Sequence, residues 1–479
     1  SMYLGLSAFL SANKDRRDLL LSQREPDFDT SFDARIAAAS DDFSRITLKA
    51  QAARDYFLLI GPPGTGKTSR ALRGMVEAFY REGKQILLLS YTNRAVDEIC
   101  KTLSVITPEI DFIRIGSELS CDPPFRSRLI ENVLESCSTR REVHARIERC
   151  RVFVGTVATF SSKTDMFRLK TFDVAIVDEA TQILEPQLLG LLCARNVAGN
   201  NAIGKFILIG DHKQLPAVVL QSESQSEVCE ECLQSIGLYN LKDSLFERLY
   251  RTVSANHSSP TTQRFYDMLC RQGRMNVEVA RFPNHAFYGG LLEAVGLPHQ
   301  QGELVLAPGL ESDEFADVLV NRVAFLPSVP EFPSQSAKIN HSEAQLTARL
   351  AAAVYRQYEA SGSGFHSALT LGVITPYRSQ IALIKREIAA LGIPVLNDIL
   401  VDTVERFQGS ERDVIIYSFC VNRTYQLKFL ANLTEEKGVW IDRKLNVALT
   451  RARKQLFMTG VPHLLRQNPI YADLLDTVL

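Results

Sequence analysis

The residues with the clearest chemical meaning form the segment GPPGTGKTS, Gly61–Ser69, which directly follows the apolar run Tyr56–Ile60. The segment matches GxxxxGK[ST], in which backbone N–H groups of a glycine-rich turn and of the next helix surround a phosphate. Glycine lets the backbone approach that phosphate closely. Lys67 would reach the β- and γ-phosphate oxygens, and the Thr68 hydroxyl would bind Mg²⁺. The pattern predicts a nucleoside-triphosphate site between a strand and a helix over 71–80, against the alternative of an exposed turn without a ligand.

A second set of candidates, Asp178 and Glu179, follows the apolar run Val174–Val177. Such a run is typical of a strand buried in a parallel sheet, where ligands bind beyond the carboxyl ends of the strands. There, Asp178 would hold Mg²⁺ through water, and Glu179 would orient and deprotonate an attacking water molecule. The alternative is that both carboxylates cap the following helix. The upstream phosphate loop favours the catalytic interpretation.

The composition indicates a globular protein of two to three domains: 479 residues, of which 46% are hydrophobic and 23% charged. The net charge of −1 means that any nucleic-acid site must be local. Nine scattered cysteines give no disulfide framework, and the lone CxxC of Cys229 and Cys232 is more typical of free thiols than of zinc. Apolar runs are too short for a bilayer and no secretory pattern begins the chain. We therefore expect an intracellular protein, located in the cytoplasm or in the nucleoid or nucleus, neither secreted nor membrane-bound, and monomeric.

Strand and helix patterns alternate along the chain, which predicts an α/β fold of doubly wound parallel sheets. The first set of expected strands covers 57–60, 85–90, 112–115, 152–155, 174–177 and 206–209. The second set covers 322–325, 369–374, 399–403, 414–419 and 456–460. The polar stretch Thr252–Gln263, with Ser258, Ser259 and Pro260, is interpreted as a linker. Two similar lobes with a cleft between them follow, at 1–254 and 255–479.

An arginine-rich helical insert interrupts the first lobe at about 117–151. It holds seven arginines and four glutamates between Cys121 and Arg151. This modest excess of positive charge is compatible with phosphate contacts and equally with a solvated helix face. Both interpretations stay open.

Further motifs separate one class of phosphate-loop enzyme from the others. They are FILIGDHKQLPAVV (Phe206–Val219), RQGRMN (Arg271–Asn276), GVITPYRSQ (Gly372–Gln380), VDTVERFQGSERD (Val401–Asp413) and RKLNVALTRAR (Arg443–Arg453). With these motifs the sequence resembles the superfamily 1 helicases, in particular the 1B branch of the nonsense-mediated-decay helicase and the nuclease-helicase of replication forks. The resemblance covers about Ala50 to Gly460, with the motifs in the family's order. It implies two RecA-like lobes of a P-loop NTPase, with ATP and Mg²⁺ as cofactors.

The resemblance also implies roles for particular residues. The phosphate-loop contacts are Gly61, Gly64, Thr65, Gly66, Lys67, Thr68 and Ser69, and the metal is held by Thr68 and Asp178. The catalytic set is Lys67, Asp178, Glu179, the γ-phosphate sensor Gln214, and the arginine fingers Arg274 and Arg451. Gly409 and Glu411 resemble the motif that meets the nucleotide's sugar and phosphate. The arginines would neutralise charge on the γ-phosphate when the lobes close.

The nucleic-acid contacts implied by the resemblance lie at strand ends. They are Thr92 and Asn93 in SYTNRAVDEI, Thr156 in VGTVATF, Thr375 in ITPYRSQ and Thr403 in VDTVERF. Hydroxyl and backbone N–H groups bind successive nucleotides alike and carry little sequence information, which suits a motor. For each threonine the alternative is a helix cap or a strand-end hydrogen bond.

The sequence departs from the family pattern around the nucleotide base. Gln51 lies only ten positions before Gly61, closer than the family's adenine-reading glutamine, and Gly273 stands where relatives commonly have a stacking aromatic. Adenine recognition is therefore in doubt, unless Tyr56 or Phe57 supplies the stack. Asn276 is more typical of the replication relatives and favours DNA. The few residues before Gly61 leave no room for the family's β-barrel domain, which this member either lacks or would carry in a longer protein.

These observations predict an ATP- and Mg²⁺-dependent helicase or translocase on single-stranded nucleic acid, moving 5′ to 3′. One alternative is a nucleic-acid-stimulated ATPase that remodels protein–nucleic-acid complexes without separating strands. Another is a nucleotide-dependent switch or scaffold, whose ATP turnover would not respond to nucleic acid. No nuclease motif is evident.

Overall fold

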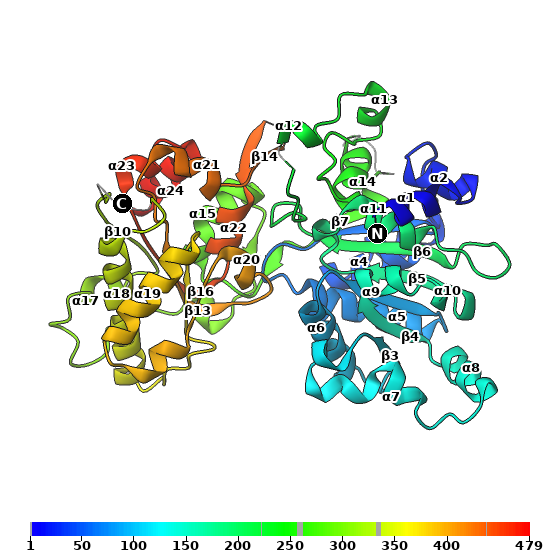
Figure 1. Cartoon of the computed structure of the whole chain (residues 1–479), viewed down its shortest axis with the longest axis horizontal. Coiled ribbons are helices and arrows are strands. Elements are labelled where there is room, and N and C mark those ends of the chain that lie inside the picture. Colours follow the sequence, from blue (N-terminus) through cyan, green and yellow to red (C-terminus); the bar gives the residue numbers. More distant parts are fainter. Residues whose placement is uncertain (1, 222, 256–261, 332–336, 437) are drawn as a thin grey trace. The chain divides into compact units, whose positions relative to one another are not determined.

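The computed structural model describes residues 2–221, 223–255, 262–331, 337–436 and 438–479 (Figure 1). The chain forms two compact units, with the boundary between Leu269 and Cys270; the second also includes Pro63–Thr65 and Lys213–Leu215. The sequence placed this boundary at 254/255. It lies later in the structure because residues 266–268 form a strand of the first sheet.

The first unit is built on a seven-stranded sheet of order β3-β4-β2-β5-β6-β1-β7, in which every pair is parallel. Its strands are β1 (Tyr56–Ile60), β2 (Ile86–Ser90), β3 (Phe112–Ile115), β4 (Val152–Thr156), β5 (Phe172–Val177), β6 (Ile203–Gly210) and β7 (Tyr266–Met268). The five residues of β1 are all buried, as are those of β2 and β4. Continuous apolar runs form these strands because helices cover both sheet faces.

The helices of the first unit either precede β1 or follow one of the strands, and two hydrophobic clusters fill the two sides of the sheet. They are α1 (Met2–Leu10), α2 (Lys14–Leu20), α3 (Asp33–Ala37), α4 (Asp42–Ala52), α5 (Arg73–Arg81), α6 (Asn93–Ser104), α7 (Ile130–Leu134), α8 (Arg140–Arg149), α9 (Val157–Ser162), α10 (Met166–Leu169), α11 (Glu185–Leu192), α12 (Glu223–Ser226), α13 (Glu231–Gln234) and α14 (Leu245–Ser254). A π-helical turn, η2 (Lys67–Leu72), precedes α5.

The second unit has a five-stranded, all-parallel sheet of order β10-β16-β13-β11-β12. Its strands are β10 (Val323–Pro327), β11 (Leu371–Ile374), β12 (Leu400–Asp402), β13 (Arg412–Ser418) and β16 (Ala452–Gly460). Two small sheets pair β8 (Arg271–Gln272) with β9 (Glu293–Ala294) and β14 (Leu433–Glu436) with β15 (Val439–Asp442). The predicted fold class, two parallel-sheet α/β lobes, is confirmed.

The helices of the second unit include one long helix, α18 (His341–Ala360), whose alanine-rich face packs in the core. The others are α15 (Val277–Tyr288), α16 (Pro298–Gln301), α17 (Ala316–Leu319), α19 (Arg378–Ala390), α20 (Val404–Phe407), α21 (Leu427–Leu430), α22 (Arg443–Leu449), α23 (Pro462–Leu465) and α24 (Pro469–Val478). Across the described ranges, no helix combines the length and apolar character needed to cross a membrane.

Each strand predicted from an apolar run is present, with its ends no more than four residues from the expected ones. The predicted linker is wrong in part, because Thr252–Ser254 end α14 and Thr262–Arg264 form the 3-10 helix η6. Ser258, Ser259 and Pro260 of that prediction lie outside the described residues.

The arginine-rich insert is helical, as α7, α8 and the 3-10 helix η4 (Pro123–Arg128). Several of its arginines pair with carboxylates: Arg128 and Arg146 contact Asp111 at 2.9 and 3.0 Å, and Arg126 contacts Glu118 at 3.5 Å. These pairs favour the interpretation of the insert as a locally neutralised surface.

One buried carboxylate joins the strands of the second sheet. Glu343, in the first turn of α18, is fully buried and accepts hydrogen bonds from the Ser418 hydroxyl and the Cys420 N–H, both at 2.8 Å. The hydroxyls of Ser328 and Thr459 lie at 3.3 and 3.4 Å. Burial nevertheless raises the pKa of Glu343 from 4.5 to about 7.

We predict that Glu343→Gln changes how stability depends on pH. The folded protein holds this proton more tightly than the unfolded chain, so Glu343 favours folding at low pH, and its contribution is lost as pH rises from about 4.5 to about 7. Between pH 5 and 8, the free energy of unfolding should therefore fall by about 3 kcal/mol more in the wild type than in the variant. Denaturant titrations at both pH values measure this, with exposed Glu314→Gln as the control. Identical pH profiles for wild type and Glu343→Gln would contradict it.

Candidate nucleotide and nucleic-acid sites

The phosphate loop lies between β1 and η2, as its sequence predicts. Gly64 and Gly66 have φ of 74° and 78°, which side chains rarely adopt, so glycine is needed at both positions. A Cβ on Gly61 would lie 2.7 Å from the Cβ of Lys67, and only glycine therefore leaves room for that lysine. The predicted helix over 71–80 is preceded by the π-helical turn, which begins at Lys67.

The two remaining predicted contacts of the loop differ in accessibility. Thr65 is buried, whereas Ser69 is exposed on η2. The Ser69 side chain can therefore contact a ligand without rearrangement. The Thr65 side chain is buried, so this residue contributes through its position in the turn.

The carboxylate pair after β5 meets the phosphate loop within the first unit. The Thr68 hydroxyl donates to Asp178 Oδ2 at 2.5 Å, and Lys67 Nζ lies 2.8 Å from Glu179 Oε1. Glu179 has a left-handed backbone with φ of 55°, an uncommon conformation for a residue with a side chain. Strained residues of this kind persist where their surroundings hold them, and they cluster at functional sites.

Gln182, which the sequence reasoning did not identify, holds the carboxylate of Glu179 from the other side. Its Nε2 donates to Glu179 Oε2 at 2.9 Å, and the Glu179 N–H donates to Asp178 Oδ1 at 2.9 Å. The available signal was its place three residues after Glu179, in the 3-10 helix η5 (Ala180–Gln182). Gln182 therefore fixes the direction in which Glu179 points.

The carboxylates of this cluster keep Lys67 positively charged. Burial by itself would lower the pKa of Lys67, but the carboxylates of Glu179 and Asp178 outweigh it and raise that pKa above its ordinary value. Burial raises the pKa of Asp178 against the opposing effect of Lys67. The cluster thus joins a fixed positive charge to two carboxylates beside a glycine-rich turn.

The residues present fit the implied Mg²⁺. Among the residues that the structure describes, no group of three or more His, Cys, Asp or Glu side chains is placed to hold a metal. Mg²⁺ commonly needs only one or two protein carboxylates when nucleotide phosphates and water complete its shell. The adjoining Thr68 hydroxyl and Asp178 carboxylate provide such a donor set.

The second unit gathers the other predicted catalytic residues. Arg274 Nε lies 2.5 Å from Glu411 Oε2, and Arg451 NH2 donates at 3.2 Å to Gln214 Oε1, a residue that belongs to this unit. Burial alone would raise the pKa of Glu411, but Arg274 and other arginines hold it below its ordinary value. Gly409, with φ of 74°, has open space where a Cβ would stand. The structure thus brings Arg274 and Glu411 together, and Arg451 and Gln214 together.

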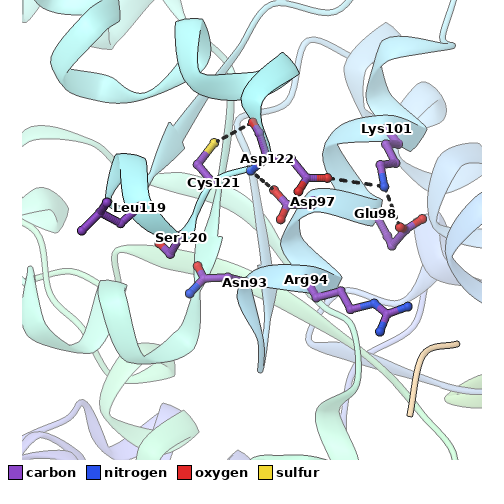
Figure 2. A pocket seen from close by; sticks show the side chains of 9 residues that line it. All are labelled: Asn93, Arg94, Asp97, Glu98, Lys101, Leu119, Ser120, Cys121 and Asp122. Carbon is purple, nitrogen blue, oxygen red and sulfur yellow. Dashed lines mark hydrogen bonds and ion pairs between the residues drawn. The ribbon is translucent and has the colours of Figure 1, made fainter. Parts of the chain in front are cut away.

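Thr92 is the N-cap of α6, and Asn93, the first residue of this helix, lines a pocket of about 440 Å³ (Figure 2). The Thr92 hydroxyl accepts the Ala95 N–H at 3.2 Å and so caps the helix, as the alternative interpretation has it. Thr92 is exposed, so its hydroxyl, which is also a donor, is accessible to a ligand.

The pocket beside Asn93 carries mixed charge. Figure 2 shows Lys101 between the carboxylates of Glu98 and Asp122, at 2.9 and 3.5 Å. Arg94 lines the same pocket, and Asp97 pairs with the buried Arg114. The lining, with two cations and three carboxylates, therefore carries no excess of positive charge.

The other three threonines differ in accessibility. Thr156 is buried and caps α9 by accepting the Thr159 N–H at 3.1 Å. Thr375 is fully buried and its hydroxyl has no hydrogen-bond partner, while Thr403, before α20, is half-buried and makes no side-chain cap. A phosphate could reach Thr92, Asn93 and Thr403 directly, whereas Thr156 and Thr375 lie beneath other side chains.

No aromatic in β1 is available for a nucleotide base. Tyr56 and Phe57 are 2% and 0% exposed, and the Tyr56 ring stacks on Phe206 in the core. Gln51 donates its amide to Glu82. A Cβ on Gly273 would meet the side chains of Leu297 and Val295 at 3.4 Å, an ordinary contact distance. The structure therefore provides no reader for the nucleotide base at Gln51, Gly273, Tyr56 or Phe57.

Comparison with known proteins matches both halves of the chain to helicase-type domains. Two family models, each described as an AAA domain, match residues 39–148 with 126–222 and residues 241–463. The "DNA replication ATP-dependent helicase/nuclease DNA2" of Bos taurus is 29% identical over 493 residues, which is 96% of this chain and 42% of that protein. The protein of the same name from Xenopus laevis is 32% identical over 86% of this chain and 36% of that protein.

The chain thus spans less than half the length of these relatives. Among solved structures, the complex of the arterivirus nonstructural protein 10 helicase with DNA is similar at a TM-score of 0.41 and 14% identity, over 87% of this chain and 62% of that chain. The AAA domain matches and the relatives aligned along most of its length, together with the motifs in their order, establish that this chain belongs to the superfamily 1 helicases, on the branch that holds the nonsense-mediated-decay helicase and the replication helicase/nuclease.

Proposed function

We propose that this chain is an ATP- and Mg²⁺-dependent motor on single-stranded nucleic acid, DNA in preference to RNA, moving 5′ to 3′ and separating strands. The observation that carries the proposal is the cluster in which Lys67 contacts Glu179 and Thr68 contacts Asp178 beside the glycine-rich turn. Relatives named ATP-dependent helicase/nuclease support it.

In the proposed reaction, Lys67 leaves Glu179 and binds the β- and γ-phosphate oxygens of ATP. Glu179, still held by Gln182, then orients the attacking water and accepts its proton. Mg²⁺, held through Thr68 and Asp178, would supply neutralising charge to the phosphate oxygens. Lys67 would thus pair with Glu179 until ATP binds, and its move to the phosphates would release Glu179 to act as the general base.

Arg274, Arg451 and Gln214 are proposed to act on the γ-phosphate. Positive charge placed at the transferring phosphoryl group stabilises the charge that develops there in the transition state. The arginines belong to the second unit and Lys67 to the first. Turnover in this proposal therefore requires both units, which is how hydrolysis would drive movement along a strand.

The proposed nucleic-acid contacts rest most firmly on Thr92, Asn93 and Thr403, because these three are accessible. For Thr156 and Thr375, contact with a phosphate requires the overlying side chains to move. Hydroxyl and amide contacts give weak sequence preference, and phosphate neutralisation makes binding fall steeply with salt.

ATP hydrolysis with and without a single-stranded oligonucleotide tests this function. A motor should hydrolyse ATP faster with the oligonucleotide and should open duplexes with a 5′ overhang. Stimulated hydrolysis without strand opening would favour the remodelling ATPase, and hydrolysis that ignores the oligonucleotide would favour the switch or scaffold. Efficient opening from a 3′ overhang alone would overturn the proposed direction.

We predict that two substitutions in the cluster separate binding from turnover. Lys67→Ala should abolish tight ATP binding, since it removes the charge that meets the phosphates. Glu179→Gln should bind ATP with little change and lose turnover, because the amide cannot accept the proton. Titration of a fluorescent ATP analogue and steady-state phosphate release measure the two effects, and exposed Lys14→Ala is the control. Normal turnover in Glu179→Gln would remove it from the role of base.

Arg451→Ala should leave ATP binding largely intact and slow turnover about 10³- to 10⁵-fold, the range for an arginine finger. Arg451 is buried, so Arg451→Lys serves as a second variant that keeps the charge without the fork geometry. Single-turnover hydrolysis gives the rates, with exposed Arg466→Ala alongside. Wild-type rates in Arg451→Ala would exclude the finger role.

Relaxed nucleotide use follows from the absence of a base reader at Gly273, Gln51, Tyr56 and Phe57. Phosphate and Mg²⁺ contacts, which every nucleoside triphosphate shares, should dominate binding. GTP and CTP should be hydrolysed within about tenfold of ATP, or about 1.4 kcal/mol, and Gly273→Tyr should lower the KM for ATP. Competition of unlabelled nucleotides against ATP hydrolysis measures this. Selectivity for ATP above about a hundredfold would reveal an unrecognised base reader.

A further inference from the structure

Two aromatic side chains protrude from the second unit in the segment after β13. Tyr425, on the 3-10 helix η8 (Thr424–Gln426), and Phe429, on α21, are 56% and 66% exposed. Their rings meet edge to face with centroids 6.5 Å apart. The neighbouring Leu427 and Leu430 are buried, so the segment is anchored while two rings remain outside. These two rings are called the aromatic platform.

The platform lies at the edge of the second sheet where the proposed nucleic-acid contacts stand. β13, β11 and β12 are parallel neighbours, so their carboxyl ends share one edge. β13 leads to the platform, β11 to Thr375 and Tyr377, and β12 to Thr403. The segment after β13 contacts the segment after β11 directly, because Gln426 Nε2 donates to the Tyr377 hydroxyl at 3.2 Å.

Buried amides hold the backbone beneath the platform. Asn422 and Gln426 are buried, and Gln426 Oε1 accepts the N–H groups of Asn422 and Arg423, both at 2.9 Å. Asn340 donates to Asn422 Oδ1 at 2.8 Å and its N–H is bound by Gln380 Oε1 at 2.9 Å. A satisfied polar network of this kind rigidifies its surroundings. The backbone that carries the rings is thus held in place before any ligand binds.

Exposed cations lie on the segments that carry the rings and Tyr377. Lys428 and Arg378 are exposed, and Lys338 Nζ lies 6.0 Å from the centroid of the Tyr377 ring. The nearby carboxylate of Glu331 is engaged by the His341 ring at 2.7 Å. Two aromatic faces among cations suit a flexible polyanion that carries flat bases, since bases stack on rings while phosphates meet the cations.

We propose that Tyr425 and Phe429 form a stacking platform for the bases of the single strand, at the sheet edge that also carries Thr403. The proposal rests on the proposed function, which it extends from phosphate contacts to base contacts. Stacking on an aromatic ring tolerates every base, since each has a flat face. The platform therefore adds grip without adding sequence preference.

The test measures the Kd of a fluorescein-labelled twelve-nucleotide oligothymidine by anisotropy. Stacking is worth about 1–3 kcal/mol per base, so Tyr425→Ala and Phe429→Ala should each weaken binding about 5- to 150-fold. Tyr425→Trp should restore it. An oligonucleotide of the same length without bases cannot stack and should bind wild type and both alanine variants equally. Tyr239→Ala, which removes a 52% exposed ring from the first unit, should match the wild type.

Two results would overturn the platform alone. One is an unchanged Kd for oligothymidine in both alanine variants. The other is an equal loss of affinity for the oligonucleotide without bases, which would indicate a structural role or a phosphate contact. Failure of the unchanged protein to bind either oligonucleotide would overturn the proposed function as well. A 2-aminopurine placed along the strand should be quenched by wild type and less by Tyr425→Ala. Equal quenching in the two proteins would count against stacking.

Discussion

Both units depend on one constraint: strands that run parallel and are buried on both faces end at the same edge of their sheet. In the first sheet, that edge carries Lys67 and Thr68 after β1, Thr92 after β2 and Asp178 after β5. Because β6 separates β1 from β5, the long side chain of Lys67 is what reaches Glu179. The sheet supplies the positions, and the side chains supply the reach and charge.

The sequence was sufficient for the features that follow from hydrophobic burial and from spacing. Runs such as Leu58–Ile60 and Val174–Val177 predict parallel strands because no polar side chain interrupts them. The meeting of the loop with the carboxylates was also predictable, since both follow such strands and the glycine pattern admits few geometries. The order of the motifs along the chain was sufficient to indicate the family.

Other features depend on contacts between residues far apart in sequence, which no local pattern carries. Gln426 and Asn340 are ordinary polar residues until the fold buries them together, and Glu343 is an ordinary first-turn acid until three strands surround it. The burial of Thr375 beneath its sheet edge is equally invisible in ITPYRSQ. Positions of hydroxyls could be predicted from the sequence, but their accessibility could not.

The short strand β7 has a consequence for fragments of this protein. It is the sole neighbour of β1 on the side away from β6. Without it, the wholly apolar strand YFLLI would present an unpaired edge, a template for pairing with another molecule. β7 carries Asp267, paired with Arg45 and Lys49 at 3.0 Å, so the outermost strand bears charge instead. A fragment of the first unit that ends at residue 254 lacks β7, so it would expose the apolar edge of β1 and self-associate. A fragment that ends at Leu269 keeps β7, which covers this edge and so opposes aggregation.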